Sequence, residues 1–221
     1  MDNKEILAHV DHTLLKAVST WEQIKKICEE TRDYNMASAC IPPSYVEKAF
    51  KDYGNDISIC TVLGFPLGYD NLETKVFSAK DAVSKGADEL DMVINIGDVK
   101  NRNYDKITYE ITKMKEAVGS KILKVIIETC YLEENEKIQL CKCVTDGGAD
   151  YIKTSTGFGT AGATMEDIIL FKKYIGPNVK IKAAGGIKTR DDMVAYLEAG
   201  CERLGTSSAL KILNGEQTGN Y

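Results

Sequence analysis

Histidine, tryptophan and proline are scarce in this chain, as are long apolar runs and clusters of positive charge. Its 221 residues include two histidines, one tryptophan and four prolines. The formal net charge is −5 and no block of lysine or arginine stands out, which argues against nucleic acid or an anionic membrane as a partner. No apolar stretch is long enough to span a bilayer, and the first residues lack a signal-peptide pattern. These absences predict a cytoplasmic protein.

The scarcity of histidine also bears on metal chemistry. His9 and His12 lie near the start of the chain, without a carboxylate cluster at metal-ligand spacing, so we expect no catalytic metal. The seven cysteines are irregularly spaced, and Cys141 with Cys143 forms C-x-C, not the C-x-x-C of redox and zinc sites. Reduced thiols that pack as small apolar groups are the simplest interpretation.

Apolar segments alternate with amphipathic segments eight times along the chain. The predicted strands are 7–11, 36–41, 57–63, 87–95, 121–128, 149–154, 179–183 and 202–205. The predicted helices are 21–33, 44–51, 72–85, 104–118, 133–145, 165–174, 190–197 and 208–213. Such alternation predicts an α/β fold with a parallel sheet, and eight units favour a single (β/α)8 TIM barrel over residues 1–213, followed by a polar C-terminal tail over 214–221. An open doubly wound sheet is the alternative, weakened because no G-x-G-x-x-G follows the first strand.

Charged residues occur within several of the predicted strands. Side chains alternate along a strand, so Leu90 and Met92 share one face while Asp91 lies on the other. The uniformly apolar faces should pack against helices, and the mixed faces should point into the barrel. The charged residues placed inside are Asp91, Lys124, Glu128, Lys153 and Lys182. A buried ion network without chemistry is one interpretation, but buried pairs are a poor source of stability, which favours a functional site.

Lys153, in the stretch 150–157, has the clearest chemical use. A neutral lysine amine attacks a carbonyl to form a Schiff base, so this amine must be made less basic than a free lysine. A neighbouring cation acts in that direction, and Lys182 lies on the adjacent predicted strand. The resulting iminium is an electron sink that allows a neighbouring carbon–carbon bond to break. Asp91 with Lys182, through a water molecule, could then relay protons.

Glycine-bearing loops follow the last three predicted strands. Barrels often bind phosphate with the loops after strands seven and eight. Gly185 and Gly186 would let backbone amides approach an anion, and Lys188 would add positive charge. The candidate phosphate-binding residues are Gly157, Gly185, Gly186, Lys188, Gly205, Ser207 and Ser208. Simple tight turns are the alternative interpretation of these glycines.

Seven segments, in order along nearly the whole chain, resemble the 2-deoxyribose-5-phosphate aldolase family. They are DHTLL from Asp11, VLGFP from Val62, ELDMVIN from Glu89, KVIIET from Lys124, YIKTSTG from Tyr151, KAAGGI from Lys182 and GTSS from Gly205. The resemblance implies a class I aldolase, a carbon–carbon lyase without a cofactor. Its substrates would be 2-deoxy-D-ribose 5-phosphate in one direction, and D-glyceraldehyde 3-phosphate with acetaldehyde in the other.

The resemblance also implies roles for individual residues. Lys153 falls on the Schiff-base lysine, Lys182 on the lysine that makes its amine less basic, and Asp91 on the acid/base aspartate. Further candidate site residues are Asp11, Thr13, Lys124 and Tyr221. The phenol of Tyr221 could shuttle a proton of the acetaldehyde carbon, although a frayed tail is the alternative.

One position departs from the family pattern. Phe158 stands where some members carry a lysine that helps to hold phosphate, so phosphate affinity would depend on Lys188 and backbone amides. Two other functions stay open, namely a transaldolase-like Schiff-base aldolase with a ketose donor and a non-catalytic sugar-phosphate-binding barrel. The oligomeric state stays open between monomer and homodimer.

Overall fold

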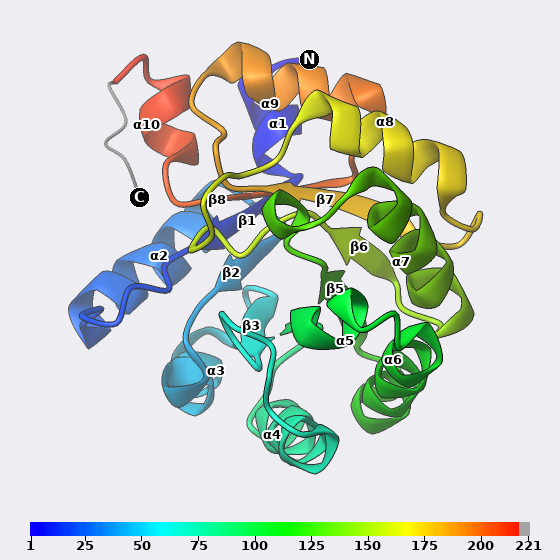
Figure 1. Cartoon of the computed structure of the whole chain (residues 1–221). Coiled ribbons are helices and arrows are strands. Elements are labelled where there is room, and N and C mark those ends of the chain that lie inside the picture. Colours follow the sequence, from blue (N-terminus) through cyan, green and yellow to red (C-terminus); the bar gives the residue numbers. More distant parts are fainter. Residues whose placement is uncertain (217–221) are drawn as a thin grey trace.

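Eight parallel strands form a closed barrel surrounded by helices in the computed structural model, which describes residues 1–216 (Figure 1). The strands are β1 (Val10–Thr13), β2 (Ser38–Cys40), β3 (Ile59–Leu63), β4 (Glu89–Val93), β5 (Ile122–Ile126), β6 (Tyr151–Lys153), β7 (Lys180–Ala184) and β8 (Arg203–Thr206). Each strand pairs in parallel with the next, and β8 pairs with β1 to close the barrel. The predicted (β/α)8 barrel is confirmed, and the open sheet is excluded.

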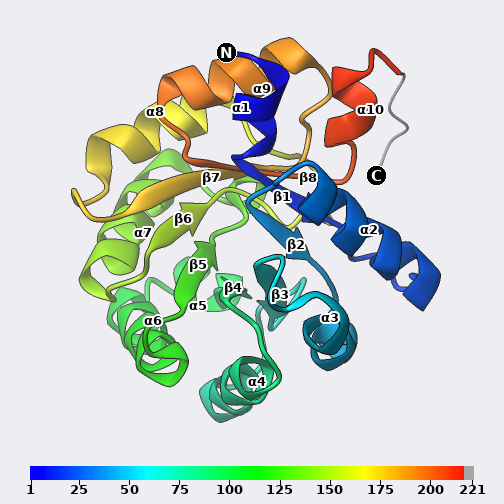
Figure 2. The same cartoon turned by 180° about the vertical axis from the view of Figure 1, so that it is seen from behind.

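Helices cover the outside of this barrel on all sides (Figure 2). The longer ones are α2 (Trp21–Asp33), α3 (Val46–Tyr53), α4 (Leu72–Ser84), α6 (Tyr104–Val118), α7 (Glu134–Asp146), α8 (Met165–Tyr174) and α9 (Arg190–Ala199), and the short α10 (Ala209–Leu213) follows β8. Local signals fix several of their ends. The Gln23 side chain accepts a hydrogen bond from the Thr20 N–H at 3.0 Å, and Thr164 Oγ1 accepts one from the Asp167 N–H at 3.2 Å. Within residues 1–216, no helix is both long and apolar enough to cross a membrane.

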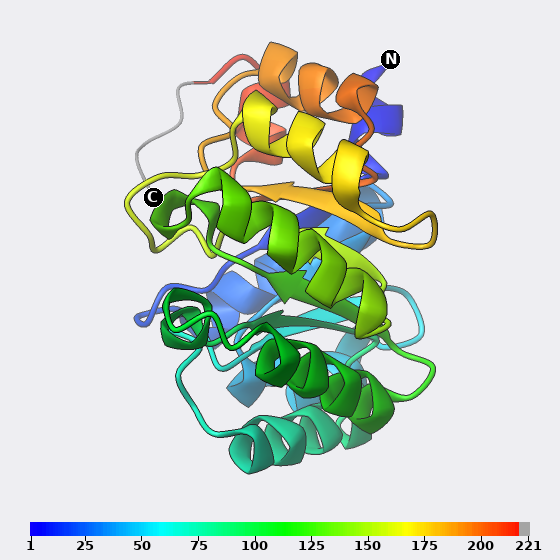
Figure 3. The same ribbon diagram turned by 45° about the vertical axis from the view of Figure 1, so that its right-hand side comes forward.

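The structure also contains short elements that the sequence pattern did not predict. They are α1 (Asn3–Leu7), α5 (Ile96–Lys100) and the 3-10 turns η1 (Pro43–Tyr45) and η2 (Thr129–Tyr131). The prediction of a strand from residue 7 is therefore wrong by three residues, because reciprocal hydrogen bonds between Asp2 and Glu5 begin a helix there. Figure 3 shows α1 at the end of the barrel where the strands begin.

Apolar side chains divide into an outer core and a small inner cluster. The outer core lies between strands and helices and includes Leu90, Met92 and Ile181, as the alternation predicted. The inner cluster is formed by Leu15, Cys40, Cys60 and Val62, against which Phe65 packs. The rest of the barrel interior holds buried charged side chains, and these define the candidate site.

Candidate active site

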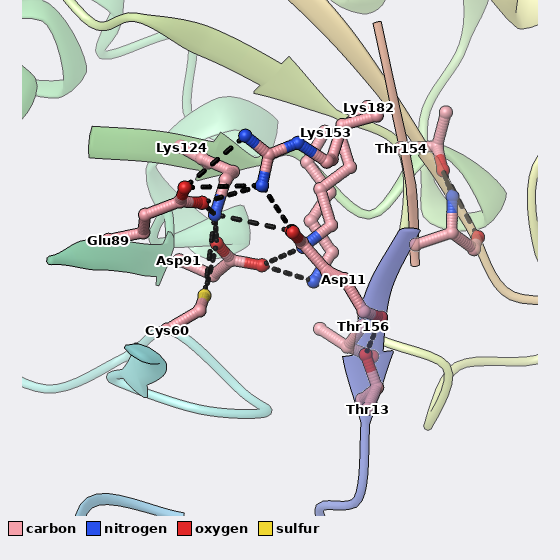
Figure 4. A network of polar contacts seen from close by, with 12 residues as sticks. Asp11, Thr13, Cys60, Glu89, Asp91, Lys124, Lys153, Thr154, Thr156 and Lys182 are labelled. Carbon is pink, nitrogen blue, oxygen red and sulfur yellow. Dashed lines mark hydrogen bonds and ion pairs between the residues drawn. The ribbon is translucent and has the colours of Figure 1, made fainter. Parts of the chain in front are cut away.

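Buried charges of opposite sign meet at Asp91 in the barrel interior (Figure 4). The Nζ atoms of Lys153 and Lys182 each donate to Asp91 Oδ2 at 2.7 Å. Lys124 Nζ donates to the other oxygen, Oδ1, at 2.9 Å. Strand register produces this arrangement, because Lys153 is paired with Lys182 and Asp91 with Lys124 on neighbouring strands. The structure thus brings together the three residues predicted to be catalytic.

A second group of charges lies around the first. Lys182 also donates to Asp11, and Lys124 Nζ lies 2.5 Å from a carboxylate oxygen of Glu89. Arg203 pairs with both Asp11 and Glu89. Neither Glu89 nor Arg203 was predicted, although Glu89 stands two residues before Asp91 and shares its face of β4, so the same alternation indicates it.

These contacts determine which groups are charged. Burial by itself raises the pKa of Asp91, but the charges of Lys124, Lys153 and Lys182 outweigh it and hold the pKa well below its usual range. Burial by itself lowers the pKa of Lys182, but Asp11 and Asp91 outweigh it and raise the pKa above its usual value. Lys182 therefore stays protonated, and it lies beside an ionised Asp91.

Within residues 1–216, four cations face three carboxylates in this cluster. The cations are Lys124, Lys153, Lys182 and Arg203, and the carboxylates are Asp11, Glu89 and Asp91. The cluster therefore holds one more cation than carboxylates, which is unfavourable for buried charges. The four cations differ in their position relative to the cavity.

A cavity of about 240 Å³ lies at the carboxyl ends of the strands, the end at which (β/α)8 barrels carry their active sites. Among the described residues, Lys153, the last residue of β6, is the one cation of this cluster that lines it. All the predicted phosphate-binding residues line it as well, namely Gly157, Gly185, Gly186, Lys188, Gly205, Ser207 and Ser208. Thr13 lines it too, whereas Asp11, Asp91, Lys124 and Lys182 are buried in the barrel interior and are not among the lining residues. Tyr221 lies outside the described residues.

The loop after β7 presents backbone donors to this cavity. Gly185 and Gly186 have φ values of 75° and 73°, a conformation that glycine adopts without strain. Within residues 1–216, the N–H groups of Gly186, Ile187 and Ser207 donate to no protein acceptor. Unpaired N–H groups that line a concave surface can bind an anion.

The loop between β6 and α8 covers the β7 loop closely. A Cβ atom on Gly162 would lie 2.3 Å from the carbonyl carbon of Gly185, so only glycine fits at this crossing. The Ala163 N–H donates to the carbonyl oxygens of Ala184 and Gly185, both at 3.1 Å. This contact fixes two sides of the cavity relative to each other. Gly162 and the lining residues Thr156 and Thr206 were not predicted as site residues.

Glu128, predicted to lie inside the barrel, supports the loop that follows Lys153. It is buried, with a left-handed backbone at φ 53°, and burial raises the pKa of its carboxyl group although Thr156 acts in the opposite direction. Its Oε1 accepts a hydrogen bond from the Thr156 N–H at 3.2 Å, and its Oε2 accepts one from the Thr156 hydroxyl. The Thr156 oxygen in turn accepts from the Phe158 N–H at 3.0 Å. Glu128 therefore positions a side chain that lines the cavity.

Replacing Glu128 with glutamine should raise KM and lower kcat, together reducing kcat/KM by about tenfold or more. The amide keeps the shape, but its NH2 group opposes one of the Thr156 donors, an unmatched contact that costs about 1–3 kcal/mol. Steady-state kinetics with urea unfolding would separate the effect on the loop from a loss of fold. Glu134→Gln, an exposed position on α7, is the matched control. Unchanged kinetics in Glu128→Gln would contradict the positioning role.

Phe158 lies immediately after the cavity-lining Gly157. Its ring contacts Phe65 edge to face, with 5.3 Å between ring centroids, and the residue is 46% exposed. The side chain therefore contributes an aromatic surface and no positive charge. Among residues 1–216, the cations that line the cavity are Lys153 and Lys188.

A barrel whose cavity is lined by a buried lysine that contacts an ionised aspartate, with a second buried lysine on the same aspartate, has the arrangement of an enzyme that forms a Schiff base. Comparison with known proteins gives the particular family. A family model described as DeoC/LacD family aldolase matches residues 5–214. The chain belongs to this family, as the sequence motifs predicted.

Individual relatives agree with this assignment over the full chain. The deoxyribose-phosphate aldolase of Clostridium botulinum (strain Alaska E43 / Type E3) is 63% identical over 221 residues, which cover 100% of both chains. That of Clostridioides difficile (strain 630) is 60% identical over 218 residues, or 99% of this chain and 100% of the relative.

Solved structures resemble this one over a similar extent. The aldolase QR15 has a TM-score of 0.91 at 34% identity, covering 96% of this chain and 95% of its own. The deoxyribose phosphate aldolase of Aeropyrum pernix, described as a unique tetramer, has a TM-score of 0.86 at 29% identity, covering 97% and 92%.

Proposed function

We propose that the protein is a class I aldolase that reversibly cleaves 2-deoxy-D-ribose 5-phosphate to D-glyceraldehyde 3-phosphate and acetaldehyde. The observation that carries the proposal is the position of Lys153, the one buried cation of the cluster that lines the cavity. Membership of the DeoC/LacD aldolase family and the named relatives support the reaction and the substrate.

In the cleavage direction, the neutral amine of Lys153 adds to the C1 aldehyde of the open-chain sugar, and loss of water gives an iminium. The C3 hydroxyl then loses its proton, the C2–C3 bond breaks, and its electron pair moves toward the iminium nitrogen to form an enamine. The C3 fragment leaves as glyceraldehyde 3-phosphate. Protonation of C2 and hydrolysis of the iminium release acetaldehyde and restore the amine.

Asp91 and Lys182 are assigned the proton transfers of this sequence. Asp91 Oδ2 accepts hydrogen bonds from both amines at 2.7 Å, so it links the nucleophile to a second proton carrier. Lys182, held charged by Asp11 and Asp91, is the second cation that contacts Asp91 next to the proposed nucleophile. Asp11 and Lys124 hold these two groups in place, and Thr13 offers a hydroxyl at the cavity wall.

The phosphate is assigned to the glycine-lined part of the cavity, where Lys188 supplies charge and the β7 and β8 loops supply N–H groups. Lys188→Met should raise KM for the phosphorylated sugar about tenfold, because it removes the one lysine of this region. KM for 2-deoxyribose without phosphate should not change. Lys211→Met, an exposed position on α10 outside the cavity, removes the same charge and should leave both KM values unchanged. An equal change for both substrates in Lys188→Met would argue against this phosphate site.

Reduction of the enzyme with borohydride in the presence of substrate tests the function directly. A two-carbon adduct on Lys153, mapped by mass spectrometry, is the expected result. A longer adduct from a ketose would instead support a transaldolase-like enzyme. No adduct, with sugar phosphate still bound, would support a non-catalytic barrel.

We also propose a cytoplasmic location. All seven cysteines are free, which supports the reducing environment of the cytoplasm. A monomer or homodimer stays our prediction for the oligomeric state, and light scattering of the purified protein would measure it.

A further inference from the structure

Two cysteines and a carboxylate converge on the inner side of the barrel, beside the charged cluster. Cys40 and Cys60 are register partners on β2 and β3, and both are fully buried. Cys60 Sγ lies 3.3 Å from Asp91 Oδ1. One ligand atom from each of Cys40, Cys60 and Asp91 lies within 4.8 Å of the other two. Neither cysteine has a role in the proposed reaction.

This spacing is close to that of a tetrahedral metal site. Two sulfurs bound to one zinc ion at about 2.3 Å lie about 3.8 Å apart, so the two sulfurs, which lie within 4.8 Å of each other, need to approach by about 1 Å at most. Two thiolates with one carboxylate are a donor set that favours soft or borderline ions such as Zn²⁺ and Cd²⁺ over Mg²⁺ or Ca²⁺. Three protein ligands leave a fourth position for water.

We propose that Cys40, Cys60 and Asp91 form an inhibitory binding site for a thiophilic divalent cation. The surrounding lysines do not exclude it, because binding exchanges one divalent cation for two thiol protons. The net charge of the buried cluster is unchanged, and no oxidation or reduction is involved. Lys124 Nζ, 3.3 Å from Cys60 Sγ, donates a hydrogen bond to this sulfur.

The expected consequence follows from the contacts of Asp91. A bound cation competes with Lys153 and Lys182 for this carboxylate and disrupts the arrangement on which the proposed proton transfers depend. The inhibition rests on the proposed aldolase function, whereas metal binding does not. Metal binding and inhibition are therefore measured separately.

The test is a titration of the purified full-length protein with CdCl2, followed by the ultraviolet thiolate-to-cadmium charge-transfer absorption. We expect one Cd²⁺ per chain, a loss of aldolase activity in parallel, and recovery of activity after addition of EDTA. Cys40→Ala and Cys60→Ala should each weaken binding at least about tenfold, since each removes one of three ligands. ZnCl2 should compete with cadmium for the same site.

Cys143→Ala and Cys201→Ala are the matched controls, because these cysteines are also buried but belong to the outer core. Both should bind Cd²⁺ like the wild type. Circular dichroism checks the fold of each variant. If Cys60→Ala is unfolded because it loses the contact with Asp91, cadmium binding by Cys40→Ala decides the result. Unchanged stoichiometry and affinity in Cys40→Ala, or no cadmium–thiolate absorption in the wild type, would overturn the site. Binding without inhibition would overturn the inhibitory role alone.

Discussion

Lys153→Leu should reduce kcat/KM by at least about four orders of magnitude, because it removes the buried amine assigned to form the Schiff base. The fold should survive. Leucine suits a buried position, and removal of one cation leaves three cations facing three carboxylates. Aldol cleavage and synthesis assays, with thermal unfolding, would measure both expectations.

Two further variants test whether Lys153 acts through its nucleophilic amine or through its positive charge. Lys153→Arg keeps the positive charge but supplies no neutral amine, so it should be as inactive as the leucine variant. Lys180→Leu removes an exposed lysine on β7 that pairs with Glu202 at 2.9 Å, and it should retain wild-type activity. If Lys153→Leu kept activity within about tenfold of the wild type, another residue would have to be the nucleophile.

Asp91→Asn should have the largest effect on stability. It leaves Lys124, Lys153 and Lys182 without the carboxylate that all three contact. Breaking a buried ion pair on one side costs about 3–5 kcal/mol in the free energy of unfolding, and loss of an acid/base group reduces kcat by about 10²–10⁴-fold. Urea unfolding and steady-state kinetics at pH 7 would measure the two effects.

The low pKa of Asp91 also predicts how the stability difference between wild type and Asp91→Asn changes with pH. The lysines lower the pKa of Asp91 in the folded state, so its stabilising contribution is complete above its unfolded value of about 3.9. That contribution is lost as the pH falls from there through the lower folded value. The difference between wild type and Asp91→Asn should therefore stay constant from about pH 8 to about pH 5 and decrease only below about pH 4.

Asp191→Asn provides the control for this experiment. Asp191 is exposed in the first turn of α9, where loss of its charge costs a few tenths of a kcal/mol at most. A difference below about 1 kcal/mol between wild type and Asp91→Asn would show that Asp91 is not the ionised centre of the cluster.

The sequence by itself predicted the barrel, the family, and the set of candidate catalytic and phosphate-binding residues. Alternation with a period of two residues identified the inward faces of the strands, so Lys153 and Lys182 could be placed inside before any distance was known. Helix signals such as Thr20 with Gln23 act over a few residues, which explains why α2 begins where the pattern predicts. These features are local and can be read from neighbouring positions.

Only the tertiary structure determined how the charges are paired and which lysine reaches the cavity. Arg203 and Asp11 are separated by 192 residues, and they meet only because β8 pairs with β1. The contact between Glu128 and Thr156 depends likewise on the alignment of two strands and on the left-handed backbone of Glu128 itself. Barrel closure and strand register are consequences of the whole chain, so no local pattern determines these contacts, and the proposed chemistry of Lys153 depends on them.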